Sequence, residues 1–324
     1  MEAQLTGRPY TIGLDLGGTN AVFGIVDGLG NIVEHTSIKT QEYDTAEAFV
    51  DAAVKALMPI IDKVGGINTI EGMGIGAPNS NYYDGTIAYA PNIAWAHECV
   101  VPFAKMFNER LSIPVSITND ANAAALGEIA YGNAGGMRDF IMVTLGTGLG
   151  SGFVAGGRMI YGHDGMAGEL GHVVVEPGGR QCGCGRRGCL ETYVSATGAK
   201  RTAFELMARE TVPSVLRDVP YDKFDARIIT EAAQKGDSLA LEVFRCTAER
   251  LGRALANAVA ITSSEAVFFF GGLAQAGELL LEPTRRYLEE NLLPVYRGNV
   301  KVLPSGIPAQ NAAILGASAL IWNE

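Results

Sequence analysis

Hydrophobic positions along the chain follow patterns that predict strands and helices in alternation. Short apolar runs bounded by turn residues predict strands at 10–14, 21–27, 70–76, 115–118, 140–145 and 266–270. Apolar residues at helical spacing predict helices at 46–63, 103–111, 121–131, 199–210, 238–261 and about 309–322. This alternation is typical of an α/β sheet, and we expect the last helix to pack back onto the first half of the chain.

The chain also repeats one local pattern. An antiparallel meander opens it, with a glycine-rich first corner at residues 15–20. The same order of strand, glycine-rich corner and strand returns in residues 140–155, where the second corner spans 146–152. Two such units at a domain-sized separation indicate an internal duplication, in which each half supplies one loop to a shared cleft.

Composition and charge exclude several classes of protein. The 324 residues are 48% hydrophobic and 19% charged, enough to bury a large core divided over two domains. The net charge of −10, without a Lys/Arg run, argues against a nucleic-acid partner. Because no apolar stretch could span a bilayer and the start does not resemble a signal peptide, we expect no membrane partner and a cytoplasmic location.

The two glycine-rich corners are candidate phosphate-binding loops. Backbone N–H groups that hold a triphosphate must point inward, and glycine leaves room for that approach. Nearby carboxylate and hydroxyl oxygens can hold phosphate oxygens and hydrated Mg²⁺. The candidate ATP-binding residues are Asp15, Gly17, Gly18, Thr19 and Asn20 in the first corner, and Thr144, Gly146, Thr147 and Gly148 in the second. Tight hairpin turns are the alternative interpretation, and the duplication favours phosphate binding.

Other nucleotide-binding motifs are absent or weak. No Gly-x-x-x-x-Gly-Lys-[Ser/Thr] string occurs, which excludes a P-loop architecture. A Gly-x-Gly-x-x-Gly match at Gly183, Gly185 and Gly188 lies within a cysteine cluster, so we interpret these as turn glycines. Gly271 and Gly272 end a predicted buried strand, where an adenine ring can approach the backbone, although a strand end alone is weak evidence.

Three cysteines and one histidine predict a metal site. Cys182, Cys184 and Cys189 follow His172 in a glycine-rich segment that can fold around one ion. Four protein ligands leave no open position, so we expect a structural Zn²⁺ that also holds Glu191 in place. A disulfide is the alternative, but Cys-x-Cys spacing and a reducing compartment disfavour it.

Asp120 follows a predicted strand, at the position where ligand sites form in α/β proteins. Its carboxylate is a candidate base for a hydroxyl that attacks the γ-phosphate of ATP. Capping of the next helix by Asn119 or Asp120 is an alternative that the motif leaves open. Further candidates for binding sugar hydroxyls through amide, imidazole or carboxylate groups are Asn92, Asn119, Glu169, His172 and Glu191.

Taken together, these motifs resemble the ROK (repressor, ORF, kinase) family of sugar kinases. The resemblance rests on Asp-Leu-Gly-Gly-Thr at 15–19, Thr-Asn-Asp-Ala-Asn at 118–122, Leu-Gly-Thr-Gly-Leu-Gly-Ser-Gly at 145–152, Gly-Glu-Leu-Gly-His at 168–172 and Cys-x-Cys-Gly-x-x-Gly-Cys-x-Glu at 182–191. Their order and spacing match over almost the whole chain. The metal motif is specific to the family, whereas the wider actin-like and hexokinase-like ATPase superfamily shares the glycine loops.

The resemblance implies an α/β, two-domain actin-like ATPase fold (ribonuclease H-like, hexokinase-type) with a cleft that closes over ATP and sugar. The expected domains are 1–118 plus 308–324, with the first phosphate loop, and 119–307, with Asp120, the zinc site and the second loop. The resemblance also implies that the protein binds ATP with Mg²⁺ and a structural Zn²⁺ and forms a homodimer or homotetramer. By the same resemblance, Asp120 is the base, and the residues that hold sugar hydroxyls are Asn92, Asn119, Asp120, Glu169, His172 and Glu191.

Within the family the chain looks most like the bacterial glucokinases, which phosphorylate the C6 hydroxyl of glucose. Kinases for N-acetylmannosamine, N-acetylglucosamine, fructose and allose use nearly the same pocket and are alternatives. Asn79 stands where many relatives carry glycine, which bears on how C2 or C3 substituents are tolerated. Other members are sugar-responsive repressors with an N-terminal helix-turn-helix domain. Only about ten residues precede the first strand here, so we expect a kinase rather than a regulator without catalysis.

Overall fold

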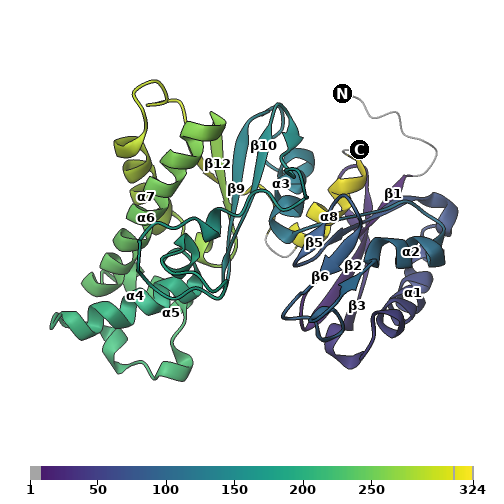
Figure 1. Cartoon of the computed structure of the whole chain (residues 1–324), viewed down its shortest axis with the longest axis horizontal. Helices are drawn as coiled ribbons and strands as arrows, with labels where there is room; N and C mark the ends of the chain where they lie inside the picture. Colours follow the sequence, from purple (N-terminus) through teal and green to yellow (C-terminus); the bar gives the residue numbers. More distant parts are fainter. Residues whose placement is uncertain (1–8, 309–310, 323–324) are drawn as a thin grey trace. The chain divides into compact units, whose positions relative to one another are not determined.

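Two five-stranded sheets with matching strand order organise the chain, as the computed structural model shows for residues 9–308 and 311–322 (Figure 1). The first sheet has the order β3-β2-β1-β4-β8 and consists of β1 (Tyr10–Leu16), β2 (Asn20–Asp27), β3 (Ile32–Lys39), β4 (Ile70–Gly76) and β8 (Val115–Thr118). The second has the order β11-β10-β9-β12-β13 and consists of β9 (Phe140–Leu145), β10 (Leu149–Ala155), β11 (Arg158–Met159), β12 (Ala266–Phe270) and β13 (Lys301–Pro304).

The pairing within the two sheets agrees with the predicted duplication. In each sheet the first strand pairs antiparallel with its successor and parallel with a later strand. Leu16 pairs with Ala21 across the first corner, and Leu145 pairs with Leu149 across the second. The second corner is therefore shorter than predicted, because residues 149–152 already pair with β9 and only 146–148 form the turn.

Eight helices of the described residues flank these sheets. They are α1 (Ala46–Lys63), α2 (Phe103–Leu111), α3 (Asp120–Tyr131), α4 (Ala196–Arg209), α5 (Ala226–Gln234), α6 (Ser238–Thr262), α7 (Glu278–Asn291) and α8 (Ala312–Trp322). A small third sheet contains β5 (Ser80–Asn81), β6 (Thr86–Ala88) and β7 (Val100–Val101). The sequence patterns did not predict α5, α7, β13 or the small sheet. Within the described ranges, no helix has the length and apolar character needed to cross a membrane.

The chain forms two units, each with its own hydrophobic core. Unit 1 takes its described residues from 1–136, 159–167 and 306–324, and unit 2 takes them from 137–158 and 168–305. This division differs from the expected boundary after residue 118. Helix α3 belongs to unit 1 because it packs against α8, and residues 159–167 return to unit 1, where the Tyr161 ring stacks on Tyr82 with centroids 3.9 Å apart. Asp120 therefore lies in unit 1.

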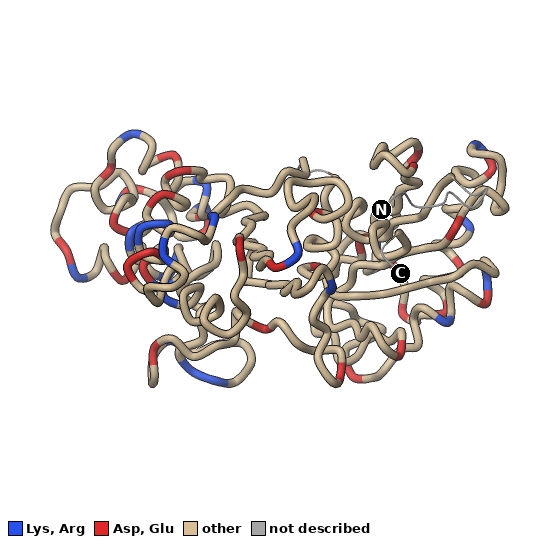
Figure 2. The backbone as a smooth tube through the Cα atoms, turned by 90° about the horizontal axis from the view of Figure 1, so that it is seen from above, with Lys and Arg blue, Asp and Glu red and all other residues tan. Residues whose placement is uncertain are grey.

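Acidic and basic residues are interspersed along the backbone of unit 2 (Figure 2). Arg245 on α6, for example, lies 2.6 Å from a Glu242 carboxylate oxygen and 3.1 Å from one of Glu249. Exposed pairs of this kind contribute only a few tenths of a kcal/mol each (~0.3–0.5). Stability therefore rests mainly on the two cores.

Glycines allow helix α8 to pack directly on strand backbone in unit 1. A Cβ added at Gly74 would overlap the carbonyl oxygen of Ala317, and one at Gly13 would overlap that of Ile314. Toward α3, a Cβ at Gly316 would lie 2.6 Å from the carbonyl oxygen of Ala123. As expected from the sequence, the last helix thus belongs with the first half of the chain, and it helps to position α3.

We expect Gly74→Ala to destabilise the protein by about 3 kcal/mol or more. The added methyl group would overlap backbone atoms of α8, which cannot rotate away as a side chain can. Gly135→Ala is the matched control, because a Cβ there meets nothing within 4 Å. Thermal unfolding of both variants is the measurement, and equal melting temperatures would contradict the close approach of α8 to β4.

Candidate active site

The first glycine-rich corner joins β1 to β2 through residues 17–19. The N–H of Gly17 donates to the Asn20 carbonyl at 2.9 Å, and the Thr40 hydroxyl donates to the Gly17 carbonyl at 2.8 Å. A Cβ at Gly18 would lie 2.5 Å from the carbonyl oxygen of Asn92. The structure therefore brings Asn92, a candidate for sugar binding, against the candidate phosphate loop within unit 1.

Asp15 and Asp120 lie at the same edge of the first sheet. Asp15 is the penultimate residue of β1, and Asp120 begins α3 shortly after β8 ends. Since β1, β4 and β8 run parallel, their carboxyl ends share one edge, where ligand sites of α/β sheets form.

Asn119, rather than Asp120, caps helix α3. Its Oδ1 accepts a hydrogen bond from the Asn122 N–H at 2.7 Å, in the usual N-cap arrangement. Asp120 Oδ1 accepts the N–H of Ala121 at 2.9 Å. Capping and a chemical role for Asp120 are therefore compatible.

Both carboxyls hold their protons more tightly than usual. Burial raises the pKa of Asp15 from 3.8 to about 6, and the negative charge of Asp120 raises it further in the same direction. The pKa of Asp120 is also raised, mainly because surrounding protein atoms displace water, although the residue is exposed at the surface of unit 1. Two neighbouring carboxylates, one of them open to solvent, are suited to a bound divalent cation.

We expect Asp15→Asn to raise the melting temperature at pH 8 but not at pH 4. Between about pH 4 and 6 the folded chain binds more protons than the unfolded chain, so stability falls as pH rises through this range. Above pH 7 the ionised Asp15 costs the folded state roughly 3 kcal/mol, a cost that asparagine removes. The measurement is thermal unfolding without Mg²⁺, and a variant no more stable than wild type at pH 8 would contradict the raised pKa.

The second corner borders a cavity of about 510 Å³ within unit 2. Gly146 and Thr147 line it together with Gly272, which follows β12. Gly271 adopts φ of 101°, and a Cβ there would lie 2.5 Å from the Leu145 carbonyl oxygen, so glycine lets this turn pack on β9. The predicted phosphate-loop and adenine-site residues thus meet at one cavity of a size typical for small-molecule sites.

Helix α5 supplies polar wall residues that the sequence analysis missed. Arg227, Thr230 and Glu231 line the cavity, and Asp225 caps the helix through the Ile228 N–H at 2.9 Å. The helical spacing of residues 226–234 and the Asp N-cap are signals that could have revealed this element.

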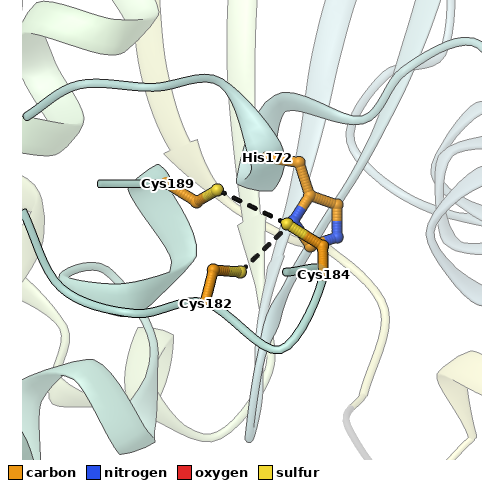
Figure 3. Close-up of side chains that lie close together, drawn as sticks. All are labelled: His172, Cys182, Cys184 and Cys189. Atoms are coloured by element: carbon orange, nitrogen blue, oxygen red, sulfur yellow. Dashed lines mark hydrogen bonds between the residues drawn. The ribbon is translucent and has the colours of Figure 1, made fainter. Parts of the chain in front are cut away.

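The four predicted metal ligands converge in unit 2 (Figure 3). Their donor atoms all lie within 4.8 Å of one another, with 3.7 Å from Cys182 Sγ to His172 Nδ1 and 3.7 Å from Cys184 Sγ to Cys189 Sγ. Ligand atoms around a tetrahedral zinc ion stand roughly 3.5–3.8 Å apart, given Zn–S and Zn–N bonds of about 2.0–2.3 Å. The arrangement and its donor chemistry fit zinc.

Glycine is required where the cluster segment turns. Gly185 and Gly188 have φ of 87° and 81°, and a Cβ at Gly188 would overlap the Glu176 carbonyl oxygen. This agrees with their interpretation as turn glycines. Within the turn, the backbone N–H of Arg186 lowers the pKa of the Cys184 thiol to about 6, which favours the thiolate form that binds a cation.

Three predicted sugar-binding residues lie at the metal cluster in unit 2, and one of them, His172, is itself a candidate ligand. His172 turns Nδ1 toward Cys182, while its Nε2 lies 3.9 Å from a carboxylate oxygen of Glu169. Glu191 Oε1 accepts a weak hydrogen bond from Cys182 Sγ at 3.9 Å. Glu169, His172 and Glu191 thus lie together in unit 2, whereas Asn92, Asn119 and Asp120 belong to unit 1.

Asn79 adopts a left-handed backbone conformation with φ of 52°. Asparagine tolerates this region better than most residues with a side chain. Its side-chain amide donates to the Tyr89 carbonyl at 3.1 Å. This hydrogen bond ties two loops of unit 1.

Residues 11–324 match the ROK family. A glucokinase of Streptomyces coelicolor is 37% identical over 318 residues, which cover 96% of each chain. The crystal structure of a ROK family glucokinase from Streptomyces griseus in complex with glucose and AMPPNP superposes with a TM-score of 0.77 at 36% identity, covering 96% of this chain and 98% of that one. An N-acetylglucosamine repressor of Escherichia coli is 28% identical over 96% of this chain and 75% of its own length.

Proposed function

The chain belongs to the ROK family, and from that premise we propose that it is an ATP-dependent kinase that converts glucose to glucose 6-phosphate. The observation that carries the proposal is the pair of carboxylates, Asp15 and Asp120, beside the first glycine-rich corner. The likeness to a glucokinase whose structure contains glucose and AMPPNP supports ATP as donor and glucose as acceptor.

Asp120 acts as the general base in this proposal. Its carboxylate accepts the proton of the C6 hydroxyl as the new oxygen–phosphorus bond forms. A pKa above the usual aspartate value makes the ionised Asp120 carboxylate a stronger base. Asp15 holds the hydrated Mg²⁺ that neutralises the phosphate oxygens.

The cavity of unit 2 takes the nucleoside. Gly272 at the end of β12 leaves space for the flat adenine ring, and Glu231 offers a carboxylate to its amino group or to the ribose hydroxyls. The N–H groups of Thr147 and Gly148 then face the phosphates. In the first corner, Gly18, Thr19 and Asn20 contact the phosphates, and Gly17, whose N–H is bonded to the Asn20 carbonyl, leaves room for their approach.

Sugar hydroxyls are held by Asn92, Asn119, Glu169, His172 and Glu191 in this proposal. His172, Cys182, Cys184 and Cys189 hold a zinc ion that stabilises the segment carrying Glu169, His172 and Glu191 and takes no part in phosphoryl transfer. Asn79, with its fixed position against Tyr89, limits the space for substituents at C2 or C3. We also propose a cytoplasmic homodimer or homotetramer, as the family resemblance implies, which light scattering can test.

An ADP-release assay over a sugar panel tests the proposal. Purified protein is given MgATP with glucose, N-acetylglucosamine, N-acetylmannosamine, fructose or allose. The highest kcat/KM is expected for glucose. ADP release with another sugar alone would overturn the assigned substrate. Sugar binding without any ADP release would instead favour a regulator, as in the repressor branch of the family.

A further inference from the structure

A segment that begins at the last candidate metal ligand forms hydrogen bonds with the second corner. In this segment, which we call the connector (residues 189–197), the Ala196 N–H donates to the Gly146 carbonyl at 2.9 Å. The Thr197 hydroxyl donates to the Thr147 carbonyl, also at 2.9 Å. At the end of the corner, Glu191 Oε2 accepts the N–H of Leu149 at 3.0 Å.

Gly148 lets the Glu191 carboxylate reach this position. A Cβ at Gly148 would overlap Glu191 Oε2, so any other residue would displace the carboxylate from the Leu149 N–H. The requirement for glycine in the corner thus has a second cause besides the approach of phosphate. Glycine at position 148 therefore allows the corner to pack closely against the connector.

Internal hydrogen bonds link the connector from Cys189 to the start of helix α4. The Thr192 hydroxyl donates to the Cys189 carbonyl at 2.7 Å, and the Ser195 hydroxyl donates to the Glu191 carbonyl at 2.8 Å. The Ser195 oxygen also caps α4 by accepting the Gly198 N–H at 2.9 Å. Because Cys189 and Ser195 are buried, these hydrogen bonds are shielded from water.

Metal ligands determine where the connector begins. Cys189 is its first residue, and Glu191 Oε1 faces the Cys182 sulfur at 3.9 Å. The intervening segment, residues 182–189, is rich in glycine and is also held by backbone hydrogen bonds within it and at its end, such as that from the Leu190 N–H to the Val173 carbonyl at 2.9 Å. A bound ion would add four bonds to this turn, and its loss would remove part of what fixes the start of the connector.

The hydrogen bonds to the corner decide which way its N–H groups point. In a trans peptide the C=O and N–H bonds point in opposite directions. Because the connector binds the Gly146 and Thr147 carbonyls, the N–H groups of Thr147 and Gly148 are directed away from it and remain available to an anion. A corner released from the connector could turn carbonyl oxygens toward the phosphates, which would repel them.

We propose that the connector couples the metal site to nucleotide affinity, with Thr197 and Glu191 as positioning residues of the second phosphate loop. The inference rests on the proposed ATP-dependent activity. Metal binding at the cysteine cluster then sets the affinity for MgATP even without sugar.

Thr197→Val tests the coupling with little disturbance of the fold, because the side chain is exposed and the substitution keeps its shape. Calorimetric titration of the zinc-loaded full chain with MgAMPPNP should show a Kd raised about 3- to 10-fold by loss of one hydrogen bond. KM for ATP should rise while KM for glucose and zinc content stay unchanged. Thr197→Ser is the matched control and should restore wild-type affinity. Unchanged nucleotide affinity in Thr197→Val would overturn the proposal.

Zinc removal gives the second arm of the experiment. Wild type stripped by a chelator should bind MgAMPPNP at least about 10-fold more weakly without sugar, and Thr197→Val should lose proportionally less because its coupling is already weakened. Equal affinity with and without zinc would overturn the coupling. Failure of zinc-loaded wild type to bind MgAMPPNP would overturn the proposed function as well. If the metal-free chain unfolds, the Thr197 pair still decides whether the connector positions the phosphate loop.

Discussion

Asp120→Asn is expected to lower kcat by about 10³-fold, within the range by which a positioned general base accelerates reactions. Asparagine keeps the shape of the side chain but cannot accept the hydroxyl proton. Helix α3 should be unaffected, because Asn119 caps it through a 2.7 Å hydrogen bond to the Asn122 N–H. The measurement is steady-state kinetics with glucose and MgATP, with glucose affinity determined separately by calorimetry and expected to change little.

A stability measurement separates loss of the base from loss of the fold in this variant. The charge of Asp120 raises the pKa of Asp15, so its removal should leave the variant at least as stable as wild type at pH 8. Wild-type kcat/KM should also fall as the pH drops below about 6, where Asp15 takes up a proton. Near-normal turnover in a folded Asp120→Asn protein would contradict the assigned role.

Removal of zinc is expected to lower the melting temperature by about 10 °C or more and to abolish sugar binding. In the proposal the ion joins four residues whose donor atoms lie within 4.8 Å of one another, in a segment that can bury little apolar surface. Glu169, His172 and Glu191 depend on the same segment for their positions. The measurements are metal content, thermal unfolding and glucose titration before and after chelation.

The two cysteines outside the cluster provide the control for metal removal. Cys99→Ser and Cys246→Ser should keep one zinc per chain and near-normal stability, whereas Cys189→Ser at the fully buried ligand should not. Metal analysis that finds no zinc in the wild-type protein, or an unchanged melting temperature after its removal, would show that the cluster has no structural metal.

Local patterns predicted those elements that local interactions determine. The meander around Gly17 and the short strand before Asn119 follow from apolar runs and turn residues, and both are present. The convergence of the four candidate metal ligands was predictable because their spacing is itself the chemical requirement for a metal site. Helix α5 was also predictable in principle, because Asp225 is a favoured N-cap residue and the apolar residues Ile229, Ala232 and Ala233, which are buried, follow at helical spacing.

Features that depend on contacts between distant residues could not be predicted. The place of α3 in unit 1 depends on close packing of Gly316 against Ala123, which are far apart in the sequence. The hydrogen bond from Thr197 to the Thr147 carbonyl likewise could not be predicted, because in the sequence Thr197 resembles any polar residue near the start of a helix. Such contacts follow from the tertiary arrangement.

The most direct test of the proposed function is to identify the product formed from glucose and MgATP by the zinc-loaded protein. We predict glucose 6-phosphate and ADP in equal amounts, detected by ³¹P NMR, with formation of both lost in Asp120→Asn. Binding of glucose and nucleotide without phosphorylated sugar, or ADP formed with free phosphate instead of a sugar phosphate, would contradict the proposal.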